Sequence, residues 1–153
     1  MKKTLGQKEA REEILSRIAR LRPDSQHQWG QMTVHEMICH LSDSYLGCMG
    51  QKYISPASGL FQRTVMKWGA LWFPMPWPKG VPTRPEVQQG VGGTPPVDFD
   101  SDRARLVELV NSFGSPEFKD SEAEHPLFGR MSRQDWMRWG HLHPDHHLRQ
   151  FGV

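Results

Sequence analysis

Four of the eight histidines of this chain lie within seven residues near its C-terminal end, at positions 141, 143, 146 and 147. His143 and His147 are four residues apart, so on a helix their imidazoles lie on one face, one turn above the other. Imidazole nitrogens are common ligands for zinc, nickel, copper and iron. The spacing therefore predicts a pair of metal ligands, which needs a third ligand from elsewhere in the chain.

The helix that must carry this pair is predicted from Ser132 to about Gln150. Its first residues resemble a capping box in which Asp135 takes the place of the usual glutamate. One stripe at helical spacing holds Trp136, Trp139, His143, His147 and Gln150. In a helical bundle such a stripe faces the interior, where an unpartnered imidazole costs about 1–3 kcal/mol. The two histidines therefore need a metal, a carboxylate or a backbone carbonyl as partner.

The third ligand is expected from an earlier helix, predicted from Thr33 to about residue 51. Thr33 and Glu36 form the capping box at its start. His40 lies on the flank of its apolar stripe, whereas His35 lies beside the cap and is expected to face solvent. His40 is therefore the candidate. Three imidazoles leave coordination positions open, which is typical of a reactive metal site rather than of a structural site closed by four protein ligands.

Pro144 lies between the two chosen histidines of the last helix. Proline has no N–H, so the hydrogen bond from residue 144 to the Gly140 carbonyl is lost and a kink is expected near residues 140–144. His141 is the alternative ligand if this kink tilts His143. It lies six residues before His147, however, and points away on a regular helix, so we retain His143.

The rest of the sequence predicts further helices and one long connection. Helical spacing indicates helices over 7–21 and 102–113 and a short one around 62–72. Most of the twelve prolines and many glycines fall between residues 56 and 96, so residues 73–97 are predicted to form a long ordered loop. No segment shows strand alternation. We therefore predict one all-α domain over residues 1–153, a four-helix bundle with a long Pro/Gly/Trp-rich loop between the second and third main helices.

The composition of the chain argues against several classes of protein. The formal net charge is only +2 and no block of five Lys or Arg occurs, which argues against a nucleic-acid-binding protein. No apolar run reaches the ~18 residues of a membrane-spanning helix, and the first residues lack the apolar stretch of a signal peptide. Cys39 and Cys48 lie nine residues apart on one predicted helix, about 13 Å along its axis, too far for a disulfide. Reduced thiols predict a cytoplasmic protein.

Several other residues could serve the site but have a simpler expected role. His125, which precedes Pro126, is expected to fix a turn. His146 is expected to be an exposed neighbour of the site or a group that orients a ligand. Asp43 could orient His40, but an ordinary exposed carboxylate is the simpler expectation. The two cysteines are expected to pack as small apolar residues.

His40 in the segment 32–41 and the terminal His143-Xaa3-His147 followed by Gln150 resemble the DinB/YfiT-like superfamily. Three segments, 29–33 (WGQMT), 125–129 (HPLFG) and 146–152 (HHLRQFG), resemble an uncharacterised bacterial branch of it. The resemblance covers nearly the whole chain in order, although the middle loop contributes little. The two spaced histidines alone are weakly specific, and the three segments together are more specific.

This resemblance implies a four-helix bundle with a divalent metal held by three histidines, here His40, His143 and His147. It does not distinguish zinc, nickel or iron, and it assigns no catalytic residue and no organic cofactor. Members of the superfamily are often dimeric, so a homodimer is compatible with it. Characterised relatives include S-transferases and isomerases that use a low-molecular-weight thiol, and a metal-dependent hydrolase.

Three functions remain open on this basis, all with a small molecule as partner. The first is a thiol S-transferase with the thiol as co-substrate. The second is a metal-dependent hydrolase of a small amide or ester, and the third a non-catalytic metal- or ligand-binding stress protein. A hydrolase needs a general base, and the only acidic residue beside the ligands of the last helix is Asp145, which faces away. The sequence therefore favours the transferase.

Overall fold

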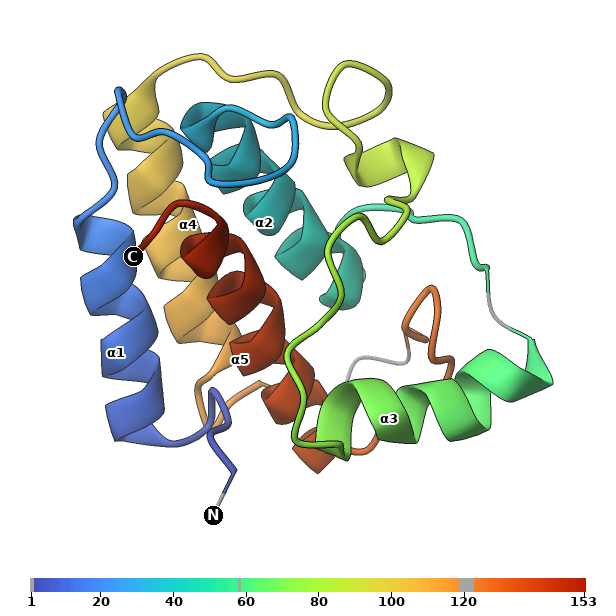
Figure 1. Cartoon of the computed structure of the whole chain (residues 1–153). Helices are drawn as coiled ribbons and strands as arrows, with labels where there is room; N and C mark the ends of the chain where they lie inside the picture. The colour runs from blue at the N-terminus through green and yellow to red at the C-terminus, as the bar shows by residue number, and fades with distance from the viewer. Residues whose placement is uncertain (1, 58, 119–122) are drawn as a thin grey trace.

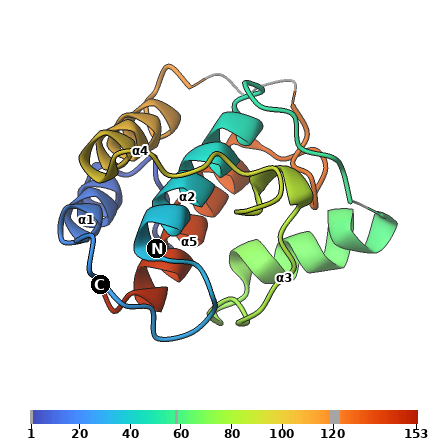
Figure 2. The same ribbon diagram turned by 90° about the horizontal axis from the view of Figure 1, so that it is seen from above.

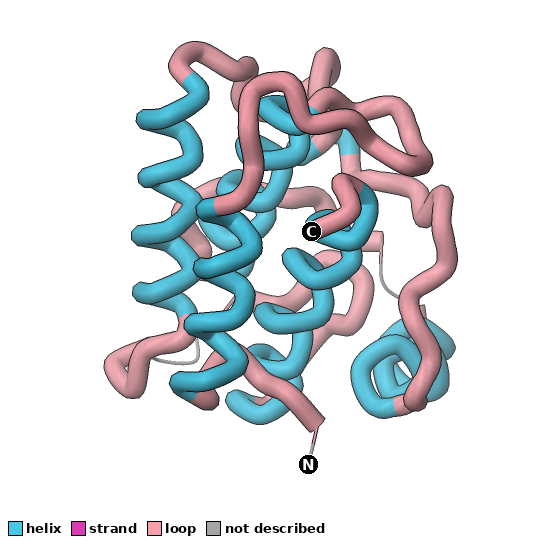
Figure 3. The backbone as a smooth tube through the Cα atoms, turned by 60° about the vertical axis from the view of Figure 1, so that its left-hand side comes forward, coloured by secondary structure: helices cyan, strands magenta, loops and turns pink. Residues whose placement is uncertain are grey.

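In a computed structural model the chain is all-α (Figures 1 and 3). The structure describes residues 2–57, 59–118 and 123–153. Over these ranges it has no strand, and only an isolated bridge joins His125 and Gly129. The α-helices are α1 (Lys8–Ala19), α2 (Val34–Cys48), α3 (Lys67–Trp72), α4 (Phe99–Phe113) and α5 (Arg133–Gln150). A π-helical turn, η1 (Gln62–Met66), runs into α3, and a 3-10 turn, η2 (Pro85–Val87), lies in the connection to α4.

Both predicted capping boxes are present. The Thr33 hydroxyl accepts from the Glu36 N–H, and the Glu36 carboxylate accepts from the Thr33 N–H. Ser132 and Asp135 form the same pair of hydrogen bonds at the start of α5. These local bonds satisfy N–H groups that the helix itself leaves without partners, which is why the sequence could place the two starts.

The ends of α3, α4 and α5, at residues 72, 113 and 150, agree with the prediction, whereas several other boundaries differ by one to three residues. α1 ends at Ala19 and α2 at Cys48, each shorter than predicted. α4 begins at Phe99, three residues before the predicted start, because the Asp98 carboxylate accepts from the Ser101 N–H and caps the helix there.

Four helices, α1, α2, α4 and α5, enclose the core (Figures 1 and 2). α2 packs more extensively on α4 than on α5, and α5 also contacts α1, α3 and α4. Large core side chains with almost no solvent exposure include Ile14, Ile18, Met37, Leu41, Tyr45, Leu106, Val110, Phe113 and Trp136. α3 lies to one side of these helices and reaches the rest of the fold through α5 (Figure 2).

The segment between α3 and α4 is fastened to α2. The Asp43 carboxylate accepts from the N–H and the hydroxyl of Thr94, both at 2.7 Å, and pairs with Lys52 at 3.1 Å. Asp43 is 1 % exposed, so the expectation of an exposed carboxylate is wrong. The segment covers this side of α2 and brings η2 against it.

α5 continues through Pro144 as a single helix. Because Pro144 has no N–H, the Gly140 carbonyl lacks its usual partner within the helix. The buried hydroxyl of Tyr45, on α2, donates to that carbonyl at 2.7 Å. A side chain from the neighbouring helix thus replaces the hydrogen bond that the proline removes.

Among the described helices, none is long and apolar enough to cross a membrane. Cys39 and Cys48 are buried and form no disulfide, in agreement with the sequence prediction.

Candidate metal centre

The structure brings together the three histidines that the sequence singled out. His40 lies on α2, and His143 and His147 lie one turn apart on α5. One nitrogen from each ring lies within 4.8 Å of the other two. The ring centroids are 4.8–5.3 Å apart, and the Nε2 atoms of His40 and His143 are 3.4 Å apart. The three rings therefore converge on one point between the two helices.

Two of the rings are oriented by neutral partners. His40 Nδ1 lies 2.8 Å from the carbonyl oxygen of Val87, and His147 Nδ1 lies 3.0 Å from Oε1 of Gln150. A carbonyl oxygen only accepts, so each Nδ1 carries the hydrogen and each Nε2 presents its lone pair. Gln150 is itself fixed, because its amide nitrogen donates to the Trp29 carbonyl at 2.7 Å. Partners of this kind orient the histidine ligands of metals.

The surroundings of the two ring nitrogens of His143 indicate whether the cluster can hold a cation. Its Nδ1 is buried without a hydrogen-bond partner among the described residues, and its Nε2 faces the lone pair of His40 Nε2. As a hydrogen bond between two ring nitrogens, the pair is long. Two imidazoles on a tetrahedral ion with 2.0–2.1 Å bonds have their nitrogens about 3.4 Å apart. The donor set therefore fits a divalent ion, although the residues do not discriminate between metals.

Electrostatics keep the cluster uncharged near neutral pH. Burial lowers the pKa of His143 well below its usual range, and the neighbouring imidazoles lower it further. Burial and His40 do the same for the pKa of His147, and burial lowers the pKa of His40. Neutral imidazole is the form that coordinates a metal, so no proton has to be displaced at pH 7.

Aromatic rings form the wall of the cluster. Trp139 lies against His143, with ring centroids 5.0 Å apart, and Trp77 lies 6.0 Å from the same ring. His146 is buried next to Trp77 and Trp29, and its Nδ1 has no partner among the described residues. The expectation of an exposed His146 is therefore wrong, because the tryptophans cover it.

Three other histidines lie outside this cluster. His125 fixes a turn as predicted, since its Nδ1 accepts from the N–H groups of Leu127 and Phe128, and burial lowers its pKa to about 3. His35 faces solvent only in part, because its Nε2 lies 2.7 Å from the Asp102 carboxylate on α4. His141 is buried on another side of α5 and does not join the cluster.

Sequence reasoning missed one group that shapes the site. The Val87 carbonyl comes from η2, 47 residues after His40, and no pattern around Val87 marks it. Trp77, in the Trp-rich loop, also reaches the site, because its indole N–H donates to the Ala70 carbonyl at 2.7 Å and its ring lies beside His143. Both depend on the path of the connection between α3 and α4.

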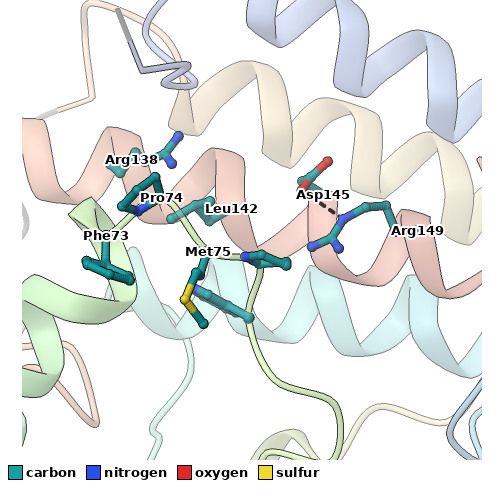
Figure 4. Close-up of a pocket in the computed structure, with 9 residues that line it drawn as sticks. Phe73, Pro74, Met75, Arg138, Leu142, Asp145 and Arg149 are labelled. Carbon is teal, nitrogen blue, oxygen red and sulfur yellow. Dashed lines mark hydrogen bonds and ion pairs between the residues drawn. The ribbon is translucent and has the colours of Figure 1, made fainter.

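A cavity of about 230 Å³ is lined by the connection that follows α3 and by one side of α5 (Figure 4). Its lining includes Phe73, Met75, Trp77, Arg138, Leu142 and Arg149, and none of the three converging histidines. Arg149 pairs with Asp145 at 3.1 Å, and Asp145 also pairs with Arg17 at 2.7 Å. Trp77 is shared by the cavity and the cluster and therefore lies between them.

Comparison with known proteins identifies the family. The family model of DUF1569, described as a protein of unknown function, matches residues 2–152. No curated protein and no solved structure matches the chain. The match covers nearly the whole length, helices and histidine cluster included, and the chain therefore belongs to the DUF1569 family.

Proposed function

We propose that this chain is a divalent-metal-dependent protein of the DinB/YfiT-like type, a four-helix bundle whose metal is held by His40, His143 and His147. One observation carries the proposal. The Nε2 atoms of His40 and His143 face each other at 3.4 Å, while the Nδ1 of His40 is engaged by a backbone carbonyl. A cation between the rings explains this arrangement better than a hydrogen bond between them.

When bound, a divalent ion on three imidazoles keeps coordination positions open and lowers the pKa of a thiol or water that reaches it. The chain's own residues prepare the site. Val87 and Gln150 hold two rings in orientation, and Trp139 and Trp77 exclude water from one side. His143 and His147 keep partial solvent exposure, which supports access by a small molecule.

The surroundings favour thiol transfer over hydrolysis. Among the described residues, the converging group contains only imidazoles and no carboxylate. The nearby acids are engaged: Asp43 with Thr94 and Lys52, and Asp145 with two arginines. Hydrolysis is helped by a general base, whereas an activated thiol needs none. We therefore propose S-transfer, in which the sulfur of a low-molecular-weight thiol bonds to an electrophilic carbon. The leaving group departs with its electron pair, and the thiol proton passes to solvent.

The metal is tested first, with protein purified without a nickel column. Elemental analysis is expected to find metal in the wild type, much less in His147→Ala, and an unchanged amount in His27→Ala, which removes an exposed histidine. Substoichiometric metal in the wild type, with no further change in His40→Ala, would rule out the site.

The reaction is tested with a panel of low-molecular-weight thiols against a small electrophile. Turnover in the wild type that is lost in His147→Ala and kept in His27→Ala supports the transferase. Hydrolysis of a small ester or amide without thiol would instead support the hydrolase. Metal retained without turnover on either panel would support a non-catalytic metal-binding protein.

A further inference from the structure

A second convergence of ligand-type side chains lies on the side of α2 that packs against α4. A ring nitrogen of His35, Cys39 Sγ and a carboxylate oxygen of Asp102 all lie within 4.8 Å of one another. Asp102 Oδ2 is 2.7 Å from His35 Nε2 and 3.8 Å from Cys39 Sγ. We propose that these three residues form a second metal site, for a zinc-class divalent ion, which is separate from the three-histidine centre.

The backbone places these groups without any rearrangement of the helices. His35 and Cys39 are four residues apart on α2 and therefore project from one face of it. Asp102 lies in the first turn of α4, and the Val97 N–H donates to its Oδ2 at 3.1 Å. The carboxylate is thus already held toward the two side chains of α2.

The distances are close to those of a tetrahedral zinc site. With Zn–N and Zn–O bonds of about 2.0–2.2 Å and a Zn–S bond of about 2.3 Å, ligand nitrogen and oxygen are about 3.4 Å apart and sulfur and oxygen about 3.6 Å. The observed sulfur–oxygen distance of 3.8 Å already fits. The nitrogen–oxygen pair at 2.7 Å must open by about 0.7 Å, which side-chain rotations of His35 and Asp102 can supply.

Charge and ligand type agree with a divalent ion. Among the described residues, the one ion pair of Asp102 is with His35. A thiolate and a carboxylate together carry two negative charges, which a divalent ion neutralises. A mixed sulfur, nitrogen and oxygen set suits zinc rather than magnesium or calcium. The ion takes the place of the Cys39 thiol proton, which passes to solvent, and of the hydrogen between His35 Nε2 and Asp102, which leaves the ring nitrogen so that the neutral imidazole carries its one hydrogen on Nδ1.

The solvent exposure of these side chains would let an ion reach the site. The side chains of His35 and Asp102 are 22 % and 21 % exposed, whereas Cys39 is buried beneath them. Phe99 packs its ring against His35 at 5.4 Å. The thiol is thus shielded from bulk water, while the imidazole and the carboxylate form the opening.

Cobalt(II) distinguishes this site from the three-histidine centre, because only this site offers a thiolate. Metal-free protein titrated with Co²⁺ is expected to take up two equivalents. Thiolate-to-cobalt charge transfer is expected to add an absorption band in the near ultraviolet. Cys39→Ser is expected to abolish the band, and Cys48→Ser, a matched change on the same helix, to keep it.

Two further variants separate the site from the proposed function. His40→Ala is expected to keep the charge-transfer band while removing the other equivalent of cobalt. His35→Ala is expected to weaken binding at the thiolate site by about 100-fold or more, since loss of a mere supporting partner already costs about 10–100-fold. A wild type without the band, or a band that survives Cys39→Ser, would overturn the proposal whatever the fate of the three-histidine centre.

Discussion

The polar groups on the two sides of α2 lie in different environments. Toward α5, the polar groups are neutral imidazoles and a tyrosine hydroxyl, buried or half-buried and directed at a carbonyl, an amide or another ring. Toward α4, His35 and the Asp102 carboxylate pair near the start of both helices, with part of each side chain in water. The packing also differs, because α2 contacts α4 more extensively than α5.

The proposed metal centre thus lies on the side of α2 that packs less extensively on its neighbouring helix. Rings of histidine and tryptophan pack against one another there, and the imidazole nitrogens depend on one another and on nearby carbonyl and amide groups for partners. The α2–α4 side carries the denser packing of the core. We expect perturbations on the first side to be larger, and the following experiments test that order.

The largest expected effect is that of pH on the metal-free protein. Burial lowers the pKa of His143 and His147 well below the usual value, and outside the cluster it lowers the pKa of His141 to about 4 and that of His125 to about 3. The unfolded chain therefore binds more protons than the folded one below about pH 6.5. The free energy of unfolding is expected to fall by several kcal/mol between pH 7 and pH 4, since one pKa unit is worth about 1.4 kcal/mol.

Urea unfolding in the presence of a chelator measures this slope. The Asp102 carboxyl gives the contrast on the other side of α2. Burial raises its pKa, but the hydrogen bond from His35 and the Val97 N–H outweigh burial, and the net pKa is lowered. Its stabilisation is present above about pH 3.9 and is lost as the pH falls through the folded pKa. A stability that stays constant from pH 7 to pH 4 would contradict the histidine interpretation.

Removal of the Tyr45 hydroxyl tests the contact that joins α2 to α5. Tyr45→Phe leaves the Gly140 carbonyl without a donor, because Pro144 supplies no N–H. We expect a loss of about 1–3 kcal/mol in the free energy of unfolding. In the Pro144→Ala background the restored N–H can satisfy the carbonyl, so the same change is expected to cost less than about 1 kcal/mol. Equal costs in the two backgrounds would show that the hydroxyl does not substitute for the helix bond.

Substitution of Gln150 tests whether metal affinity depends on the orientation of the His147 ring. Gln150→Leu removes the oxygen that accepts from His147 Nδ1 and leaves the three converging rings in place. We expect metal affinity to fall about 10–100-fold, measured by competition with a chromophoric chelator. Gln150→Glu keeps an acceptor at the same position and is expected to retain more of the affinity than the leucine variant. Identical affinities in both variants would argue against an orienting role.

The smallest loss in the free energy of unfolding is expected for a change on the side of α2 that faces α4. His35→Ala removes an ion pair that is partly exposed, and such pairs contribute about 1 kcal/mol or less. Urea unfolding in the presence of a chelator isolates this contribution from any bound metal. A loss in the free energy of unfolding larger than that of Tyr45→Phe would show that the α4 side of α2, and not the α5 side, is the more sensitive to substitution.

The sequence by itself determined the features that depend on neighbours along the chain. The capping boxes at Thr33 and Ser132 join residues three positions apart, and the pair His143 and His147 follows from helical geometry. Periodicity also predicted the all-α class. The start of α4 was missed because Asp98, Asp100 and Ser101 are all of residue types that cap helices, and a short-range pattern does not rank such alternatives.

Only the tertiary structure decided the features that depend on distant segments. The carbonyl of Val87 orients His40 across 47 residues, Tyr45 supplies the donor that Pro144 lacks, and the covering segment buries Asp43. The same holds for the pairing of His35 and Cys39 with Asp102. Each contact forms because a buried polar group must find a partner wherever the fold provides one, and local sequence does not specify which distant group that is.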